Sequence, residues 1–219
     1  MRVSYLLLVA ALVLASGSAL AQRPVPMLTG TPSHRYIHAN ALQVLYSQSG
    51  DRGTGINSQN YDHEFDAYDD EAADDFIVPE GARWRIKEVD MAGYYNEGPA
   101  DNFTITFYKN QHGKPGNTIA TFTIVPPYYN GDGSMPLALD GYVTLKPGHY
   151  WVSIVADQNF GIGNGQWSWA SRDVTTYRPA VWRVPGDGFG IGCTEWTVDT
   201  KCIPYGQGDH VFTLKGKSR

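Results

Sequence analysis

Short segments of alternating apolar and polar residues, separated by turn signals, constrain the fold of this chain more than any other feature. Phe103, Ile105 and Phe107 point to one face of a predicted strand, and the threonines between them point to the other. A turn rich in Gly and Pro follows at residues 112–116, and β-branched residues are frequent in residues 118–125. The pattern predicts two strands joined as an antiparallel hairpin.

Comparable segments recur along the chain, with turn signals about every ten residues and hardly any helical period. Within residues 84–91 the apolar phase shifts at Val89, which indicates a β-bulge or the end of one face. We therefore predict an all-β fold, a single-domain antiparallel β-sandwich with jelly-roll-like topology over residues 41–219. The further predicted strands are residues 42–46, 76–78, 84–89, 142–145, 150–155 and 209–214.

The N-terminus has the pattern of a secretory signal peptide. Arg2 precedes an apolar run at residues 6–14, and Ala19-Leu20-Ala21 forms an A-x-A cleavage site. The apolar run is too short to cross a bilayer core of about 30 Å, and no later stretch is long enough. We predict cleavage after Ala21, an irregular lead-in over residues 22–40, and secretion to the extracellular or periplasmic space.

Net charge limits the class of partner. Without residues 1–21, which contribute only Arg2, the chain carries 16 Lys and Arg against 22 Asp and Glu, a net charge of −6. This acidity argues against a nucleic-acid or anionic-membrane surface. The remaining length suffices for one large β domain with a proper core.

Two cysteines, Cys193 and Cys202, lie close together near the C-terminus. In an exported protein such a pair predicts a disulfide bond. The alternative is a redox or metal-binding pair, but the C-x₈-C spacing is not one that those sites use.

Residues 61–79 concentrate carboxylates just before an apolar strand, and hard oxygen ligands of this kind hold Ca²⁺ in many proteins. We predict a structural calcium held by Asp74, Asp75 and Asp209, with the residues 62–71 as a solvated approach. Alternation places Asp74 on the face of Phe76, pointing into the core. In the alternative, Asp75 is solvated, and Asp74 accepts backbone N–H groups or pairs with an arginine, Arg83 or Arg85.

Aromatic residues are frequent in the last quarter of the chain. Trp167 and Trp169 share one strand face. Exposed together, these and other aromatic side chains would form a flat surface that holds a sugar ring. Burial in the core is the alternative, and it is the usual fate of tryptophan in a sandwich. The residues of this predicted aromatic surface are Trp167, Trp169, Trp182, Trp196, Tyr94 and Tyr95.

Catalysis has little support in the sequence. The chain has no G-x-S-x-G or H-E-x-x-H motif and no cysteine nucleophile with a partnered histidine. Carboxylate pairs such as Asp66 with Asp75, or Glu88 with Asp157, are compatible with glycoside hydrolysis. Because the chain has so many acids, such pairs are uninformative. A hydrolase acting on polysaccharide is therefore only the second hypothesis.

The sequence resembles a widespread group of bacterial exported β domains, over residues 42–216. Some members of that group end in a Pro-Glu-Pro sorting segment, and this chain ends at Arg219 without one, so we expect a freely released protein. The resemblance is carried by Val44-Leu45-Tyr46-Ser47-Gln48, Ala73-Asp74-Asp75-Phe76, Gly93-Tyr94-Tyr95, Asp101-Asn102-Phe103-Thr104-Ile105, Phe107-Tyr108, Pro115-Gly116, Gly148-His149-Tyr150-Trp151-Val152-Ser153-Ile154, Trp167-Ser168-Trp169 and Asp209-x-x-Phe212-x-Leu214-x-Gly216.

That resemblance implies a secreted sandwich domain and brings no activity with it. The layout is more loosely similar to jelly-roll carbohydrate-binding modules, which implies a calcium shared between an acidic residue near the first strand and an Asp in the last. We therefore expect a secreted, non-catalytic binding or structural module, with a glycan as its ligand. A purely structural or interaction role is the remaining alternative.

Overall fold

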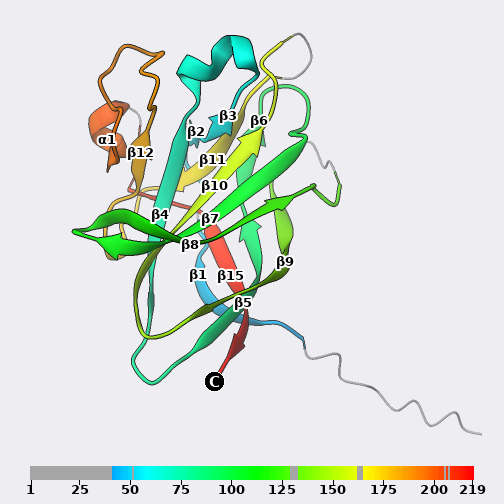
Figure 1. The fold of residues 1–219 in the computed structure, drawn as a ribbon, viewed down its shortest axis with the longest axis vertical. Helices are drawn as coiled ribbons and strands as arrows, with labels where there is room; N and C mark the ends of the chain where they lie inside the picture. Colours follow the sequence, from blue (N-terminus) through cyan, green and yellow to red (C-terminus); the bar gives the residue numbers. More distant parts are fainter. Residues whose placement is uncertain (1–40, 51, 129–132, 162–164, 205, 207) are drawn as a thin grey trace, which may run out of the picture. The chain divides into compact units, whose positions relative to one another are not determined.

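The computed structural model describes residues 41–50, 52–128, 133–161, 165–204, 206 and 208–219. The predicted signal peptide and lead-in, residues 1–40, lie outside this part of the chain. The described strands form three sheets, two of which face each other as the layers of a sandwich (Figure 1). The predicted fold class, an antiparallel all-β sandwich, is confirmed.

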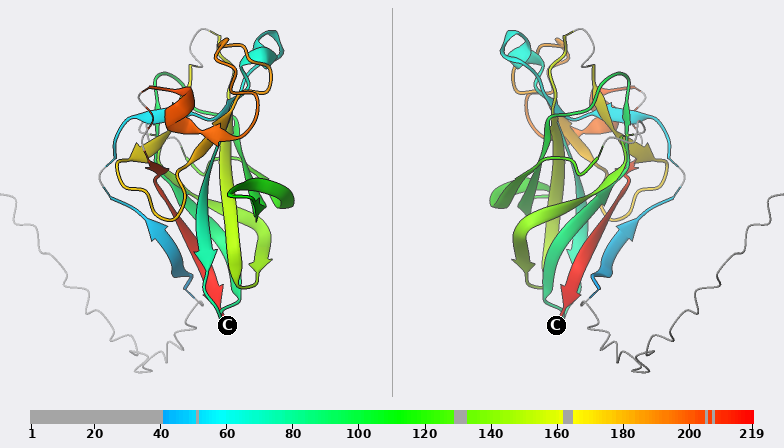
Figure 2. Two further views of the ribbon diagram at one scale, coloured as in Figure 1. Left: turned by 90° about the vertical axis from the view of Figure 1, so that its left-hand side faces the viewer. Right: turned by 90° about the vertical axis from the view of Figure 1, so that its right-hand side faces the viewer.

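The first layer pairs the two ends of the domain. It has the strand order β1-β15-β5-β9, and all its pairs are antiparallel. Figure 2 shows β1 and β15 side by side. Its strands are β1 (Gln43–Gln48), β15 (Phe212–Ser218), β5 (Trp84–Met91) and β9 (Met135–Leu145).

The second layer has the order β13-β12-β4-β10-β7-β8, and the short β3 runs parallel to the end of β10. Its strands are β13 (Thr197–Val198), β12 (Val181–Arg183), β4 (Glu71–Val78), β10 (Gly148–Asp157), β7 (Asn102–Gln111), β8 (Lys114–Ile124) and β3 (Gln59–Asn60). A 3₁₀ helix, η1 (His63–Tyr68), connects β3 to β4.

A third, smaller sheet has the order β14-β11-β2, with β6 also paired to β11. Its strands are β14 (Asp209–His210), β11 (Trp167–Arg172), β2 (Gly55–Asn57) and β6 (Gly93–Tyr95). The short helix α1 (Asp199–Cys202) lies between β13 and β14 in the chain.

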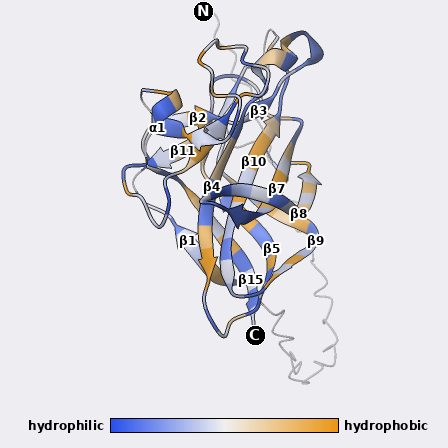
Figure 3. Cartoon of the chain, turned by 60° about the vertical axis from the view of Figure 1, so that its left-hand side comes forward, coloured by the Kyte–Doolittle hydropathy of each residue, from blue (hydrophilic) through white to orange (hydrophobic). Residues whose placement is uncertain are grey.

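Aromatic side chains link the two layers of the sandwich. Phe76 of β4 stacks on Trp84 of β5 with 6.3 Å between ring centroids, and it meets Phe107 of β7 edge to face at 6.4 Å. Phe103, Ile105 and Phe107 are fully buried, as their alternation predicts. Figure 3 shows β4 banded with apolar and polar residues, which is the pattern of a strand that faces a core.

The predicted hairpin is confirmed. β7 and β8 pair antiparallel and are joined by His112 and Gly113, both with positive φ (54° and 79°). Two left-handed residues are what a tight hairpin turn requires, and glycine adopts that conformation without strain. The predicted phase shift in β5 is also confirmed, because its register to β9 slips between Ile86 and Glu88.

The predicted closing strand at residues 209–214 differs from the structure. It is divided at Val211 into β14, which pairs with β11, and β15, which pairs with β5. Val211 donates its N–H to Ala170 across 2.9 Å and accepts one from Ala92 across 3.2 Å. The chain changes sheet at this residue, and local alternation carries no sign of such a change.

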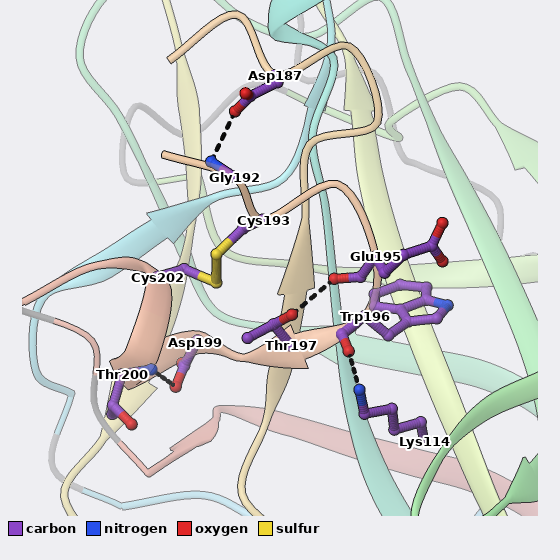
Figure 4. The surroundings of a disulfide bond; sticks show 10 residues. All are labelled: Lys114, Asp187, Gly192, Cys193, Glu195, Trp196, Thr197, Asp199, Thr200 and Cys202. Carbon is purple, nitrogen blue, oxygen red and sulfur yellow. Dashed lines mark hydrogen bonds between the residues drawn. A yellow bond between two sulfur atoms is a disulfide. The ribbon is translucent and has the colours of Figure 1, made fainter. Parts of the chain in front are cut away.

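Cys193 and Cys202 form the predicted disulfide bond (Figure 4). The bond ties α1 to the end of the loop that follows β12, and Val184 at the start of that loop donates its N–H to Cys193 across 2.8 Å. With both sulfur atoms in this bond, the pair does not bind a metal. In the described part of the chain, no helix has the length and hydropathy needed to cross a membrane.

Candidate ligand-binding site

The helix η1 lies at the end of the sandwich opposite the C-terminus (Figures 1 and 2). An aromatic pocket of about 240 Å³ lies beside it. Three segments supply its walls: the chain from β3 through η1, the loop after β10, and the loop after β12. The lining side chains are Tyr61, Phe65, Tyr68, Phe160, Gln166 and Phe189.

The aromatic rings of the pocket contact one another edge to face. Phe65 meets Phe160 with 5.3 Å between ring centroids, and Tyr61 meets Phe160 at 6.0 Å. Tyr68 meets Phe189 at 5.1 Å. Aromatic rings favour this geometry because the positive edge of one faces the negative face of the other. The contacts hold three distant segments of the chain together.

Three of the rings are exposed to solvent. Tyr68 is 38% exposed, Phe160 43% and Phe189 41%, whereas Tyr61 at 7% forms the base of the pocket. Contiguous apolar surface of this kind marks interaction sites more often than single exposed residues do. The cluster is therefore the strongest candidate binding site in the described structure.

Acidic side chains fix the segments that carry the rings. Asp62 at the start of η1 accepts the backbone N–H of Phe160 through Oδ2 across 2.9 Å. Asp69, which follows η1, accepts the N–H of Tyr61 through Oδ1 across 2.8 Å. Part of the acidic stretch thus organises the aromatic pocket rather than remaining only solvated.

Two glycines allow the loop after β12 to approach η1. Gly188 donates its N–H to the carbonyl of Ala67 across 2.7 Å. A Cβ atom added at Gly186 or at Gly188 would lie 2.6 Å from backbone atoms of Ala67. Only glycine fits at such a distance, so these residues let the loop bring Phe189 against Tyr68.

Tyr61 is the polar centre of the pocket. Its hydroxyl oxygen accepts N–H bonds from Gln166 (2.9 Å) and Asn57 (3.3 Å). Burial, and then the nearby carboxylate of Asp70, raise the pKa of Tyr61 above its ordinary value. The hydroxyl therefore stays protonated, and its hydrogen can be donated to a bound ligand.

A second hollow, of about 330 Å³, adjoins the first and shares Phe189 with it. Its walls are mostly apolar, and Asp70 also lines it. Asp70 is 3% exposed, contrary to the predicted solvated approach, and its Oδ1 accepts the N–H of Gln59 across 2.8 Å. Its Oδ2 has no hydrogen-bond partner among the described residues. Burial raises the pKa of Asp70 well above the usual range.

The tryptophans of the predicted aromatic surface are buried, so that surface does not exist. Trp167, Trp169 and Trp182 are at most 1% exposed, and each donates its indole N–H to a backbone carbonyl, across 3.0, 3.0 and 2.8 Å. Trp196 is 8% exposed and lies under the guanidinium of Arg183, 4.3 Å from the ring centroid. Trp167 and Trp169 do share a face, but that face points into the core.

The two tyrosines of the same prediction lie in β6, next to β11. Tyr94 is 36% exposed and donates its hydroxyl to the carbonyl of Gly53 across 3.0 Å. Tyr95 is half-buried, and its hydroxyl accepts the N–H of Ala100 across 3.3 Å. With the tryptophans inside, these tyrosines do not form a flat surface with them.

The first predicted calcium ligand, Asp74, points into the core as its alternation predicts, and it is fully buried. Its Oδ1 accepts the N–H of Asp75 across 2.7 Å, and its Oδ2 accepts the N–H of His210 across 2.6 Å and the side-chain amide of Gln48. Burial, followed by the charge of Asp209, raises the pKa of Asp74 well above its usual range. Asp74 thus accepts backbone N–H groups, as in the alternative reading.

The other two predicted ligands are buried as well, so Asp75 is not solvated. Asp75 hydrogen-bonds to Nε2 of His149 and accepts the N–H of Arg178 at 3.4 Å. Asp209 accepts the N–H of Thr176 through Oδ2 across 2.5 Å. Burial raises the pKa of both carboxyls to about 7.

These carboxylates do not fit a calcium site. The structure does bring the three acids near one another, because the charge of Asp209 raises the pKa of Asp74 and the charge of Asp75 raises that of Asp209. Most of their oxygens accept protein N–H groups instead of facing a common centre. In residues 41–219, as far as they are described, no group of three or more His, Cys, Asp or Glu side chains is arranged to hold a metal ion. Calcium binding stays a prediction.

No family model, curated protein or solved structure matches this chain. Function must therefore be argued from the geometry of the site.

The carboxylate pairs considered for hydrolysis are not presented to a common cleft. Asp66 is exposed on η1 and pairs with His63 across 2.7 Å, whereas Asp75 is buried in β4. Glu88 pairs with Lys215 in the first layer, and Asp157 accepts the side-chain amide of Asn60 in the second.

The aromatic pocket was not predicted from the sequence, although one signal for it exists. Tyr61, Phe65 and Tyr68 follow a spacing of four and three residues, which places side chains on one face of a helical segment. The surrounding carboxylates obscure that pattern. Phe160 and Phe189 lie in glycine-rich loops, where nothing local indicates that they meet.

Proposed function

We propose that this protein is a secreted, non-catalytic binding module that holds a glycan at the aromatic pocket around η1. The carrying observation is the group of exposed rings, Tyr68, Phe160 and Phe189, that three separate segments bring together over a hollow. Sugar rings have apolar C–H faces that pack on aromatic side chains, and a few polar groups then fix their orientation. Gln166 and the hydroxyl of Tyr61 provide such groups.

The pocket is built before any ligand arrives, which supports a binding role. Asp62 fixes the backbone of Phe160, and Ala67 fixes that of Gly188. Wall residues that are already held in place lose less conformational entropy on binding. A purely structural protein has no need of a hollow lined by half-exposed rings.

Secretion is part of the same proposal. The N-terminal pattern of Arg2, an apolar run and an A-x-A site supports export. The bond between Cys193 and Cys202 supports an oxidising compartment, because disulfides seldom persist in the cytosol.

Binding to an array of neutral, amino and acidic glycans, followed by calorimetry on the best ligand, tests the proposal. We expect Phe160→Ala to weaken binding by about tenfold or more, because one wall of the pocket is lost. Tyr142→Ala is the matched control: Tyr142 is also an exposed aromatic residue, 53% exposed, but it lies beside Arg85 in the first layer. A blank array with folded protein, or equal loss in both variants, would overturn the proposal.

A further inference from the structure

The segments that form the aromatic pocket are acidic and contain no strong base. Residues 57–70, 157–166 and 184–192 include neither Lys nor Arg, and His63 is their one basic side chain. Their acids are Asp62, Glu64, Asp66, Asp69, Asp70, Asp157 and Asp187. The field in the hollow is therefore negative, and it disfavours sulfated or uronic-acid sugars.

The contacts of Asp62, Asp66 and Asp69 bring no buried cation to the pocket. Asp62 and Asp69 accept backbone N–H groups, which are neutral. Asp66 is paired with His63, whose side chain is 98% exposed, so solvent screens that pair. None of these contacts supplies a buried cation that would cancel the negative potential around the rings.

Asp70 adds an independent observation. It is almost fully buried, it lines the hollow that adjoins the pocket across Phe189, and its Oδ2 lacks a partner in the described structure. A buried carboxyl oxygen without a donor is costly, and a positive charge bound nearby stabilises the ionised form of the acid. The aromatic ring of Phe189, which lines both hollows, attracts a cation in its own right.

We propose that the glycan recognised here is an amino sugar with free, positively charged amines. This inference rests on the proposed glycan-binding function. Its ammonium group lies against the aromatic rings and within the field of the surrounding carboxylates, and the C–H face of the sugar packs on Phe160 and Phe189. Acetylation of the amine removes the charge and most of this selectivity, and leaves the stacking contacts in place.

Calorimetry with two matched oligosaccharides tests the proposal: a fully deacetylated β-1,4-linked glucosamine oligomer and its N-acetylated counterpart of the same length, at mildly acidic pH and low salt. We expect the deacetylated oligomer to bind about tenfold more tightly, from one desolvated cation–π and charge contact. Added salt should reduce its advantage, because the charge attraction is screened.

Two variants locate the effect: Asp66→Asn removes an exposed charge, and Asp70→Asn removes a buried acid that a bound ammonium group would hold ionised. Asp70→Asn and the exposed Asp66→Asn should each reduce the preference for the deacetylated oligomer, with little change for the acetylated one. Asp66 is on the surface, so that variant stays informative if Asp70→Asn does not fold. Asp140→Asn, an exposed change in β9, is the control and should leave both affinities unaltered.

Several outcomes would overturn the proposal. Equal binding of the two oligomers would remove the amino-sugar inference and leave the glycan-binding function standing. Binding of neither oligomer, with neutral glycans still bound on the array, would do the same. Choline binding more tightly than either oligomer would assign the pocket to a methylated ammonium instead of a sugar, and no binding of any glycan would remove both proposals.

Discussion

The N–H of Gly188 donates to the carbonyl of Ala67 across 2.7 Å, and this contact joins the loop that carries Phe189 to the 3₁₀ helix that carries Phe65 and Tyr68. The shape of the aromatic pocket depends on how closely the two backbones approach each other.

Substitution of Gly188 by alanine should therefore separate the loop from η1. The added Cβ would lie 2.6 Å from the carbonyl oxygen of Ala67, and relieving such overpacking costs about 1–3 kcal/mol. We expect a lower midpoint of urea unfolding and weaker ligand binding. Gly50→Ala is the control, since nothing lies within 4 Å of a Cβ there. Unchanged stability and binding in Gly188→Ala would contradict the close approach.

Tryptophan fluorescence should be shielded from a soluble quencher such as acrylamide. All six tryptophans are between 0% and 8% exposed, because their rings belong to the core or lie under neighbouring side chains. We expect weak quenching in the native protein and strong quenching in urea. Strong quenching of the native protein would contradict the burial of the tryptophans and support the predicted exposed aromatic surface.

Stability should fall as pH rises from about 4 to about 7 through the buried acids. Burial raises the pKa of Asp75 and Asp209 to about 7, whereas an unfolded aspartate titrates near about 3.9. In this window the folded chain binds more protons than the unfolded chain, so the free energy of unfolding decreases with pH. Asp209→Asn should flatten that slope, as measured by urea unfolding at several pH values.

His210 acts in the opposite direction. Burial lowers its pKa to about 3, so the folded chain keeps it neutral while the unfolded chain binds a proton below about pH 6.5. The stability contributed by neutral His210 is lost as pH falls through that range. Comparison of the wild-type chain with Asp209→Asn separates the contribution of Asp209 from that of His210. If the free energy of unfolding depends on pH identically in both proteins, Asp209 does not titrate with a raised pKa.

Calcium should have little effect on thermal stability. The oxygens of Asp74 are already occupied by N–H donors from Asp75, His210 and Gln48, and Asp75 bonds to His149. We expect the same melting temperature in EDTA, after addition of calcium, and in buffer. A rise of several degrees with calcium, lost in Asp74→Asn, would reinstate the predicted metal site.

Local sequence was enough to predict the long strands such as β7, because their alternation and turn glycines depend only on neighbouring residues. The short strands β2, β3, β12 and β13 were not predicted. The local pattern could not predict whether a given face of a strand is buried in the core or exposed to solvent. Trp167 and Trp169 were correctly placed on one face, but whether that face meets solvent depends on the layer packed against it. The division of the closing strand at Val211 likewise depends on tertiary structure, because the two halves pair with strands of different sheets.

The aromatic pocket could be predicted only in part. Tyr61, Phe65 and Tyr68 are near one another in the chain, and their spacing indicates a shared face. Phe160 and Phe189 join them through contacts between loops, which no local pattern encodes. The inward direction of Asp74 was predicted correctly, whereas the burial of Asp70 and Asp75 was not, because both are covered by distant segments.

The disulfide between Cys193 and Cys202 closes the base of the loop that presents Phe189, beside the hydrogen bond from Val184 to Cys193. Maturation of the pocket is therefore linked to oxidation. A chain with both cysteines reduced lacks this fastening, so the position of Phe189 depends on a covalent bond that lies outside the pocket.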